Sequence, residues 1–310
     1  MDTHRLLIFR EVARTESIAA AARKLGWTQP AVSQHLRHLE RQAGLPLVVR
    51  HSRGIRLTEA GATLLRHADA IATRLHAAED DMAALADLSA GTVRLAAFPS
   101  ASATLVPTAM TDLARRHRGL EIRLTQCEPP AAADLVTSGE ADLAVLFSHD
   151  DRPPDHGPDL QVIPLTTDPV RLVVPTGHAA VTAAEPLTVL TTTPWIAGCP
   201  GCAAHLTRTC ELAGFTPDIR HSTDDYVVIQ NLVARNLGVA LLPQLALDAY
   251  RHPDVQVRPL GTADRTHYLL CHREALQTPS VTQTTRSLQQ AAAARQKPDG
   301  LSRSRCTTPG

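Results

Sequence analysis

The stretch TQPAVSQHLRHLERQAG, residues 28–44, decides how the first part of this sequence folds. At about 100° per residue, Val32, Leu36, Leu39 and Ala43 fall on one narrow stripe. The opposite side carries an amide, a hydroxyl and guanidinium groups, which hydrogen-bond to base edges and phosphates in a major groove. We therefore expect a helix that buries its aliphatic stripe and turns its polar face outward. That face consists of Pro30, Ser33, Gln34, Arg37 and Arg41.

Capping signals around this stretch indicate two short helices joined by a tight turn. Ser17 is a suitable N-cap for the segment that follows it, and Gly26 ends that segment. Thr28 can cap the next helix, and Pro30 falls in its first turn, where the missing N–H breaks no hydrogen bond. Gly44, followed by a proline, ends the second helix.

The pair of helices has the residue types of a helix-turn-helix. Ala22, Gly26 and Val32 supply its small residue, its turn glycine and its core residue. A polar face that merely meets solvent is the alternative explanation of the outer residues. Two short strands within 45–57 are expected to form a hairpin with Arg53 at its tip, suited to a DNA backbone or minor groove.

Charge is unevenly distributed along the chain, although it sums to zero. Residues 1–66 hold 11 basic and 5 acidic residues, a balance of +6, so the remaining residues carry −6. A basic first segment is expected when one end of a protein meets phosphate. The chain shows neither a secretory signal nor the roughly 18 consecutive apolar residues of a membrane span. We therefore expect a cytoplasmic protein whose six cysteines are mostly reduced.

A heptad seam follows from Thr58 onward on a predicted helix of about thirty residues. No partner for this seam lies nearby in the sequence, which predicts pairing with the same helix of a second subunit. Packing on the chain's own body is the alternative. The seam consists of Leu64, Ala68, Ile71, Leu75, Ala78, Met82 and Leu85.

Beyond this helix, strand-like and helix-like segments alternate, which is typical of βαβ units on a largely parallel sheet. A first set covers 92–147, a second covers 170–243, and a late strand is expected over 267–272. Prolines and glycines at 153–158 mark an exposed loop. The tail 296–310 is polar, contains proline and glycine, and is expected to be disordered.

The order of these parts resembles the LysR-type transcriptional regulators. The likeness is specific over about sixty residues at the start, whereas the later matches are short but correctly ordered. It is carried by FREVARTESIAAAARKLGWTQPAVSQHLRHLERQAGLPLVVRHSRGIRLTEAG (9–61), GTVRLA (91–96), SGEADLAVL (138–146) and NLGVALLPQLA (236–246).

The resemblance implies an α+β multidomain protein. It would have an N-terminal winged helix-turn-helix (1–58), a long linker and dimerisation helix (59–90), and a C-terminal α/β domain (91–295). That last domain would have two lobes, as in type 2 periplasmic binding proteins, with a small-molecule effector between them. The protein would form a homodimer or, as a dimer of dimers, a homotetramer.

The resemblance also implies lobe boundaries and the residues that contact promoter DNA. Lobe one would cover about 92–163 and 267–294, and lobe two about 164–266. Gln34 stands where such proteins often have arginine, so a contact to adenine or through water is expected there. The implied DNA-binding residues are Thr28, Gln29, Pro30, Ser33, Gln34, Arg37 and Arg53.

In a cleft of this kind, helix N-termini and short polar side chains hold a small effector. Thr223, Asp224 and Asp225 precede a predicted helix, and simple capping is the alternative for all three. If either aspartate faces the cleft, a cationic effector such as a basic amino acid is favoured. We assign effector binding to Ser100, Ser102, Phe147, Cys199, Gly201 and Thr223.

Four residues, Cys199, Cys202, His205 and Cys210, read C-x2-C-x2-H-x4-C, close to metal-ligand spacing. On a helix, His205 and Cys210 lie on different sides of Cys202, so one zinc ion could not collect all four without distortion. We assign no metal. A thiol- or metal-responsive regulator that uses Cys199 and Cys202 is the alternative function, and purely structural cysteines are the third possibility.

An effector-responsive transcription factor is the function that these residues favour. The sequence offers no persuasive nucleophile, base and orienting group, and no P-loop or dinucleotide fingerprint, so neither an enzyme nor a cofactor is expected. An exported solute-binding protein would need a signal peptide. A DNA-architectural protein would not need a body of about two hundred residues.

Overall fold

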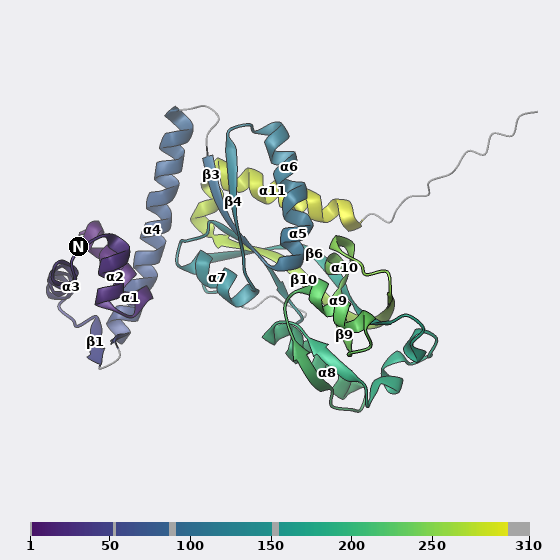
Figure 1. Cartoon of the computed structure of the whole chain (residues 1–310). Coiled ribbons are helices and arrows are strands. Elements are labelled where there is room, and N and C mark those ends of the chain that lie inside the picture. Colours follow the sequence, from purple (N-terminus) through teal and green to yellow (C-terminus); the bar gives the residue numbers. More distant parts are fainter. Residues whose placement is uncertain (1, 52–53, 87–90, 151–154, 297–310) are drawn as a thin grey trace, which may run out of the picture. The chain divides into compact units, whose positions relative to one another are not determined.

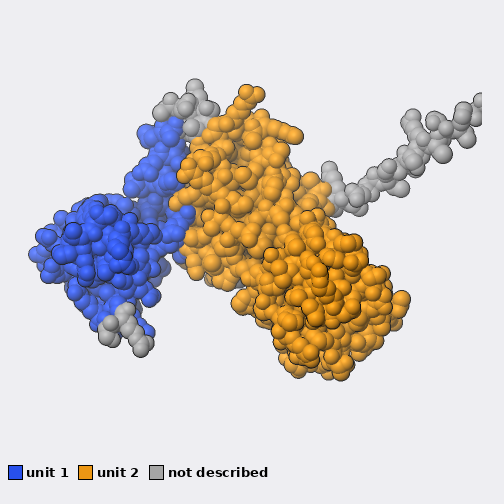
Figure 2. Space-filling view, viewed as in Figure 1, with its two compact units in different colours: residues 1–83, 137–140 blue, residues 84–136, 141–310 orange. Residues whose placement is uncertain are grey.

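The computed structural model describes residues 2–51, 54–86, 91–150 and 155–296. It divides into two compact units, residues 1–83 with 137–140 and residues 84–136 with 141–310 (Figure 2). Arg53, residues 153 and 154 of the predicted loop at 153–158, and the tail beyond 296 lie outside the described residues. The predictions made for them therefore stay predictions.

The first unit begins with three helices and a two-stranded antiparallel hairpin (Figure 1). Ser17 Oγ accepts from the Ala20 N–H and Gly26 takes a left-handed φ of 68°, so the predicted ends of the first short helix are confirmed. Thr28 lies at the next N-cap, as predicted, but makes no cap hydrogen bond. The elements are α1 (Thr3–Thr15), α2 (Ile18–Leu25), α3 (Gln29–Ala43), β1 (Val48–His51) and β2 (Gly54–Leu57).

The aliphatic stripe predicted for α3 forms part of a small buried core. Val32, Leu36 and Leu39 are buried, and Ala43 packs at the edge of the same cluster. Phe9 and other apolar residues of α1 and α2 belong to the same cluster, together with Leu47, Ile55 and Ala68. Burying a leucine, valine or phenylalanine side chain contributes about 1.5–3 kcal/mol each, so this stripe fixes the rotation of α3 about its axis.

The helix α4 (Glu59–Ala86) carries the predicted heptad seam. Near its start Leu64 packs on the small core and Ala68 is fully buried. Farther along, Ile71, Leu75 and Met82 are 39%, 44% and 61% exposed within the single chain. The first part of the seam thus belongs to the fold of this unit, whereas the later part leaves apolar side chains open to a partner.

The second unit is built on an eight-stranded sheet in the order β4-β3-β5-β10-β6-β9-β7-β8. The parallel pairs β3 with β4 and β5, and β7 with β8 and β9, confirm the two sets of βαβ units. The strands are β3 (Gly91–Ala97), β4 (Leu120–Gln126), β5 (Leu143–Ser148), β6 (Leu160–Pro175), β7 (Pro194–Ala197), β8 (Asp218–Ser222), β9 (Val239–Pro243) and β10 (Val255–His272).

The long strands β6 and β10 pair antiparallel and join the two halves of this unit. One end of each lies in the half with β5, and the other end lies in the half with β9. The sequence predicted only the ends 170–175 and 267–272 as strands. Pro164 and Pro169 lie within β6, and the β6–β10 ladder accommodates them with register shifts between Pro259 and Asp264 and between His267 and Tyr268.

Helices cover the sheet and begin close to the ends of its strands (Figure 1). Helix α6 packs against α11, and α10 packs against α5. Within the described residues, no helix is both long and apolar enough to cross a bilayer. The helices are α5 (Pro99–Ala103), α6 (Leu105–Arg116), α7 (Pro129–Thr137), α8 (Pro200–Leu212), α9 (Tyr226–Ala234), α10 (Gln244–Ala249) and α11 (Pro279–Gln296).

Two helical glycines differ in the space around them. A Cβ on Gly61 of α4 would lie 2.0 Å from the carbonyl oxygen of Leu47, whereas a Cβ on Gly201 of α8 meets nothing within 4 Å. We predict that Gly61→Ala lowers the free energy of unfolding by about 1–3 kcal/mol, because backbone must move. The control Gly201→Ala should raise it by about 0.4–1 kcal/mol. Urea denaturation followed by circular dichroism measures both, and equal stabilities would contradict the close packing.

Candidate functional site

The outer face of α3 presents most of the predicted contact residues to solvent. Thr28, Gln29, Pro30, Gln34 and Arg37 are exposed, and Ser33 is half-buried. The Arg37 Nε donates to the Ser33 carbonyl oxygen at 3.3 Å, which supports the guanidinium on the helix surface. The structure thus brings six of the seven predicted residues onto one helix and its N-cap.

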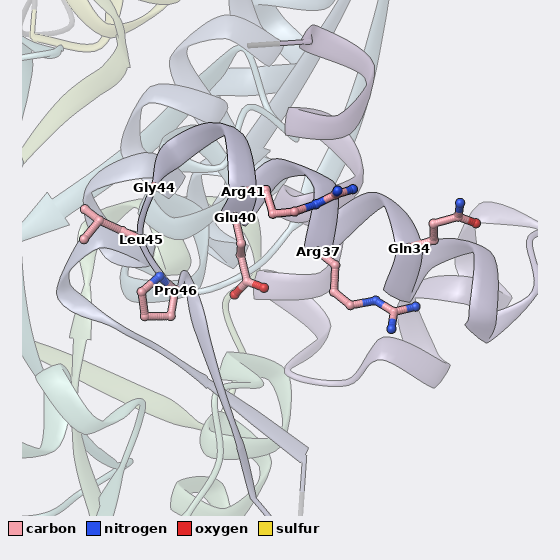
Figure 3. A pocket seen from close by; sticks show the side chains of 7 residues that line it. All are labelled: Gln34, Arg37, Glu40, Arg41, Gly44, Leu45 and Pro46. Atoms are coloured by element: carbon pink, nitrogen blue, oxygen red, sulfur yellow. The ribbon is translucent and has the colours of Figure 1, made fainter.

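A hollow of about 770 Å³ lies along α3 and the turn that follows it (Figure 3). Gln34, Arg37 and Arg41 line it together with Glu40. The only acid among them is engaged, because Glu40 Oε1 accepts from the backbone N–H groups of Leu47 at 2.9 Å and Val48 at 3.3 Å. This carboxylate therefore connects α3 to the start of β1, and its negative charge partly offsets the positive charge of Arg37 and Arg41.

The hairpin adds basic residues that the sequence analysis did not single out. Arg50 on β1 and Arg56 on β2 are exposed, and they flank the tip that would carry Arg53. The available signal for Arg56 was its position directly after the apolar Ile55, which is buried, because successive strand residues point to opposite faces.

The predicted effector residues lie around two cavities of the second unit. Ser100, Phe147 and Cys199 line a space of about 60 Å³, and Phe147, Cys199 and Gly201 line a larger one of about 580 Å³. In the described part of the chain, Ser102 and Thr223 line neither cavity. The Ser102 hydroxyl donates to the Ala97 carbonyl oxygen, and the Thr223 hydroxyl accepts from the Asp225 N–H.

A buried ion pair at the centre of this unit was missed by the sequence analysis. Arg265 on β10 is 3% exposed, and its Nε and Nη2 donate to Asp168 Oδ2 on β6 at 3.0 and 2.8 Å. Its Nη2 also donates to Ser100 Oγ at 2.7 Å. The guanidinium carbon lies 4.8 Å from the Phe98 ring centre and 4.5 Å from that of Phe147, a cation–π arrangement.

The carboxylate of Asp168 is saturated with partners. Its Oδ1 accepts from the Leu245 N–H at the start of α10, and His267 Nε2 lies 3.5 Å from its Oδ2. Burial alone would raise the pKa of Asp168, but the nearby His267 imidazole and the charge of Arg265 outweigh it and lower that pKa. Burial lowers the pKa of His267 to about 4, so its imidazole is neutral near pH 7.

Three further cleft residues come from separate segments. Glu128 precedes α7, Cys199 caps α8, and Asp224 precedes α9. One ligand atom from each of the three lies within 4.8 Å of the others. Asp224 therefore faces the cleft, as the sequence analysis allowed, whereas Asp225 caps α9 through hydrogen bonds from Val227 and Val228.

The four residues of the C-x2-C-x2-H-x4-C pattern do not converge. Cys199 and Cys202 lie with their sulfur atoms 3.0 Å apart, but Cys210 is part of a hydrophobic core cluster. His205 instead stacks on His149 at 4.0 Å between ring centres, and both ring nitrogens of each lack a hydrogen-bond partner. Burial lowers the pKa of His149 to about 3 and also lowers that of His205.

A winged helix-turn-helix attached to a two-lobed cleft domain defines a class of ligand-responsive DNA-binding proteins. The model of the bacterial regulatory helix-turn-helix protein, lysR family, matches residues 3–62, and that of the LysR substrate binding domain matches residues 86–293. The chain therefore belongs to the LysR family of bacterial regulators. The two matches cover both the helix-turn-helix region and the cleft domain.

The individual relatives that match this chain share only part of its sequence. The HTH-type transcriptional regulator BbuR of Bordetella bronchiseptica is 33% identical over 173 residues, 56% of this chain and 52% of BbuR. The chain spans about half the length of the first curated relatives that it matches.

Solved structures share the fold. ArgP from Mycobacterium tuberculosis has a TM-score of 0.69 at 21% identity, covering 94% of this chain and 98% of ArgP. Full-length CbnR, complexed with its target DNA, has a TM-score of 0.60 at 21% identity and covers 94% and 100% of the two chains.

The buried ion pair yields a stability prediction. Asp168→Ala would leave Arg265 buried without its counter-charge, so we expect the free energy of unfolding to fall by about 3–5 kcal/mol. Asp150→Ala removes the exposed partner of Arg208 and should change it by about 0–1 kcal/mol. Trp195, buried in β7, reports unfolding of this unit by fluorescence in a Trp27→Phe background. Similar losses in both variants would refute the role given to the ion pair.

The low pKa values of His267 and His149 predict an acid sensitivity. Both are neutral in the folded unit at pH values where the unfolded chain already binds protons, so stability decreases as pH falls from about 6.5 toward about 4. We expect a loss of about 3 kcal/mol for each of the two histidines over this range. Urea denaturation at a series of pH values measures it, and His149→Phe should flatten the slope. A slope unchanged in this variant would contradict the assignment.

Proposed function

We propose that this protein is a transcriptional regulator that binds promoter DNA through α3 and responds to a small molecule in the cleft of its second unit. The observation that carries the proposal is the two-sided character of α3. Its aliphatic side is buried, while its outer side exposes amide and guanidinium groups from the first turn onward. A protein that binds promoter DNA in a bacterium would act in the cytoplasm, and the proposed regulation does not require catalysis.

The N-terminal end of α3 is suited to approach the bases. Gln29 and Pro30 form a first turn without bulky or acidic side chains, and helix N-termini attract phosphate. Gln34, one turn farther along, can form a bidentate contact to adenine. Arg37 and Arg41 are placed to neutralise phosphates, which positions the helix without reading sequence.

The hairpin would provide a second contact to the same duplex. Arg50 and Arg56 are exposed on its strands, and Arg53 is assigned to its tip. Such a wing reaches the backbone or the minor groove beside the recognition helix. Basic groups at both places explain why the positive charge of the sequence concentrates in residues 1–66.

The exposed part of the α4 seam supports pairing with a second copy. Ile71, Leu75 and Met82 recur at heptad spacing and are open to solvent in the single chain. A pair of such helices would hold two recognition helices at a fixed separation, so that paired half-sites are read together. A dimer of these dimers would give the homotetramer.

The effector is assigned to the cleft between the halves joined by β6 and β10. Phe147, Glu128 and Cys199 line both of its cavities, so a ligand there would contact the two halves at once. The linker and effector domains are taken as 59–90 and 91–295, with lobes at about 92–163 plus 267–294 and 164–266. A ligand that favours one lobe angle would change the spacing of the DNA-binding units and hence the bend of the promoter.

Charge reversal on α3 tests the proposal. We predict that Arg37→Glu weakens binding to the protein's own upstream DNA at least about tenfold and lowers the salt dependence by about one counterion, because a phosphate contact is lost. Arg123→Glu, on the exposed surface of β4, is the matched control and should bind normally. Gel-shift titrations at several salt concentrations provide the measurement. Normal binding by Arg37→Glu would exclude α3 as the DNA-contacting helix.

A further inference from the structure

One corner of the cleft gathers ligand-type side chains that the proposed regulator does not require. Glu128, Cys199 and Asp224 offer a carboxylate, a sulfur and a second carboxylate within 4.8 Å of one another. Among the described residues, no other group of three or more histidine, cysteine, aspartate or glutamate side chains comes together in this way. Three separate connections between strands and helices converge to form it.

A second sulfur stands beside this group. Cys202, one turn into α8, has its Sγ 3.0 Å from that of Cys199, and its N–H points to the Cys199 sulfur at 3.4 Å. Both cysteines are free thiols, and both line the 60 Å³ cavity together with Glu128 and Asp224. The corner therefore holds two sulfur and two carboxylate groups.

The corner has an excess of negative charge and an unsatisfied acceptor. Glu128 Oε2 is buried and has no hydrogen-bond partner. Burial and the neighbouring charge of Asp224 raise the pKa of Glu128. The positive charge of Arg265 acts in the opposite direction and lowers the pKa of Glu128, but its Nε and Nη2 donate to Asp168 and Ser100. A cationic ligand would reduce the repulsion between the carboxylates of Glu128 and Asp224 and would give Glu128 Oε2 a partner.

We propose that Cys199, Cys202, Glu128 and Asp224 bind a divalent metal ion of the zinc class. Two thiolates with two carboxylates suit the borderline character of Zn²⁺ and its tetrahedral preference, whereas Mg²⁺ and Ca²⁺ prefer oxygen alone. Ligand atoms in such a site lie roughly 3.3–3.8 Å apart, so Glu128, Cys199 and Asp224, whose ligand atoms lie within 4.8 Å of one another, need only a small contraction. Cys202 joins the set through Cys199, since their sulfur atoms lie 3.0 Å apart. A cavity of 60 Å³ admits an ion and water but is small for an amino acid.

Metal binding at this corner would join the two halves of the unit. Glu128 follows β4 in one half, while both cysteines and Asp224 follow β7 and β8 in the other. Coordination requires deprotonated ligands, so the two thiols and any protonated carboxyl release their protons to solvent as the ion enters. The metal site itself does not depend on the proposed function. Only an effect of metal binding on the DNA-binding unit rests on that function.

The test uses the full-length protein, reduced and stripped of metal, with Co²⁺ as a spectroscopic probe. We expect one Co²⁺ per chain, a sulfur-to-cobalt charge-transfer band in the near ultraviolet, and displacement by Zn²⁺. Cys199→Ser and Cys202→Ser should each weaken or abolish this band. Glu128→Gln and Asp224→Asn should weaken Zn²⁺ binding at least about tenfold, because they remove a ligand charge.

Matched controls separate the site from general metal affinity. Cys127→Ser changes the cysteine next to Glu128, and Asp150→Asn changes an exposed acid at the larger cavity, so both should keep the band. Circular dichroism melting verifies that each variant folds.

Absence of the band in the reduced wild-type protein, or its survival in the double variant Cys199→Ser and Cys202→Ser, would overturn the metal site. DNA binding by the same preparation is measured separately, by gel shift. DNA binding without metal binding refutes only this inference, and metal binding without DNA binding refutes only the regulator.

Discussion

Burial of Val32, Leu36 and Leu39 in the core formed with α1 and α2 determines which face of α3 meets solvent. Each of these side chains stabilises the same rotation of the helix, so Gln34 and Arg37 have no alternative but to point outward. The carboxylate of Glu40, bonded to two backbone N–H groups at the start of β1, fixes the hairpin to the same helix. A rigid support of this kind gives the polar face a defined shape, which recognition of a duplex requires.

The second unit depends on a different constraint, the ion pair of Arg265 with Asp168. The two residues lie on the paired strands β10 and β6, the strands that run through both halves. Because Ser100 and the Leu245 N–H bond to the same pair, helices of the cleft wall are held to the central strands. The cleft is therefore built around a saturated polar centre, and its free ligand groups, Glu128 and Asp224, lie on the walls.

Local signals were sufficient for the first unit and only partly for the second. Caps, turn glycines and a 3.6-residue period act within a few residues, so Ser17, Gly26 and the stripe of α3 were predicted correctly. The continuity of β6 through Pro164 and the pairing of Arg265 with Asp168 depend on contacts between residues about one hundred positions apart, which no local pattern encodes. The same is true of Glu128, whose cleft neighbours come from β7–α8 and β8–α9. The sequence analysis singled out Cys199 and Cys202 by their spacing, but their neighbours in the fold are carboxylates from other segments.

The central claim is that the exposed face of α3 lies against DNA bases. Site-specific photocrosslinking tests it most directly, with a photoreactive group in place of Gln34 and, as the comparison, in place of Arg123 on β4. The account predicts crosslinks from position 34 to bases within the bound promoter site and none from position 123. Crosslinks from position 123 with none from position 34 would show that a different surface of the protein meets the duplex.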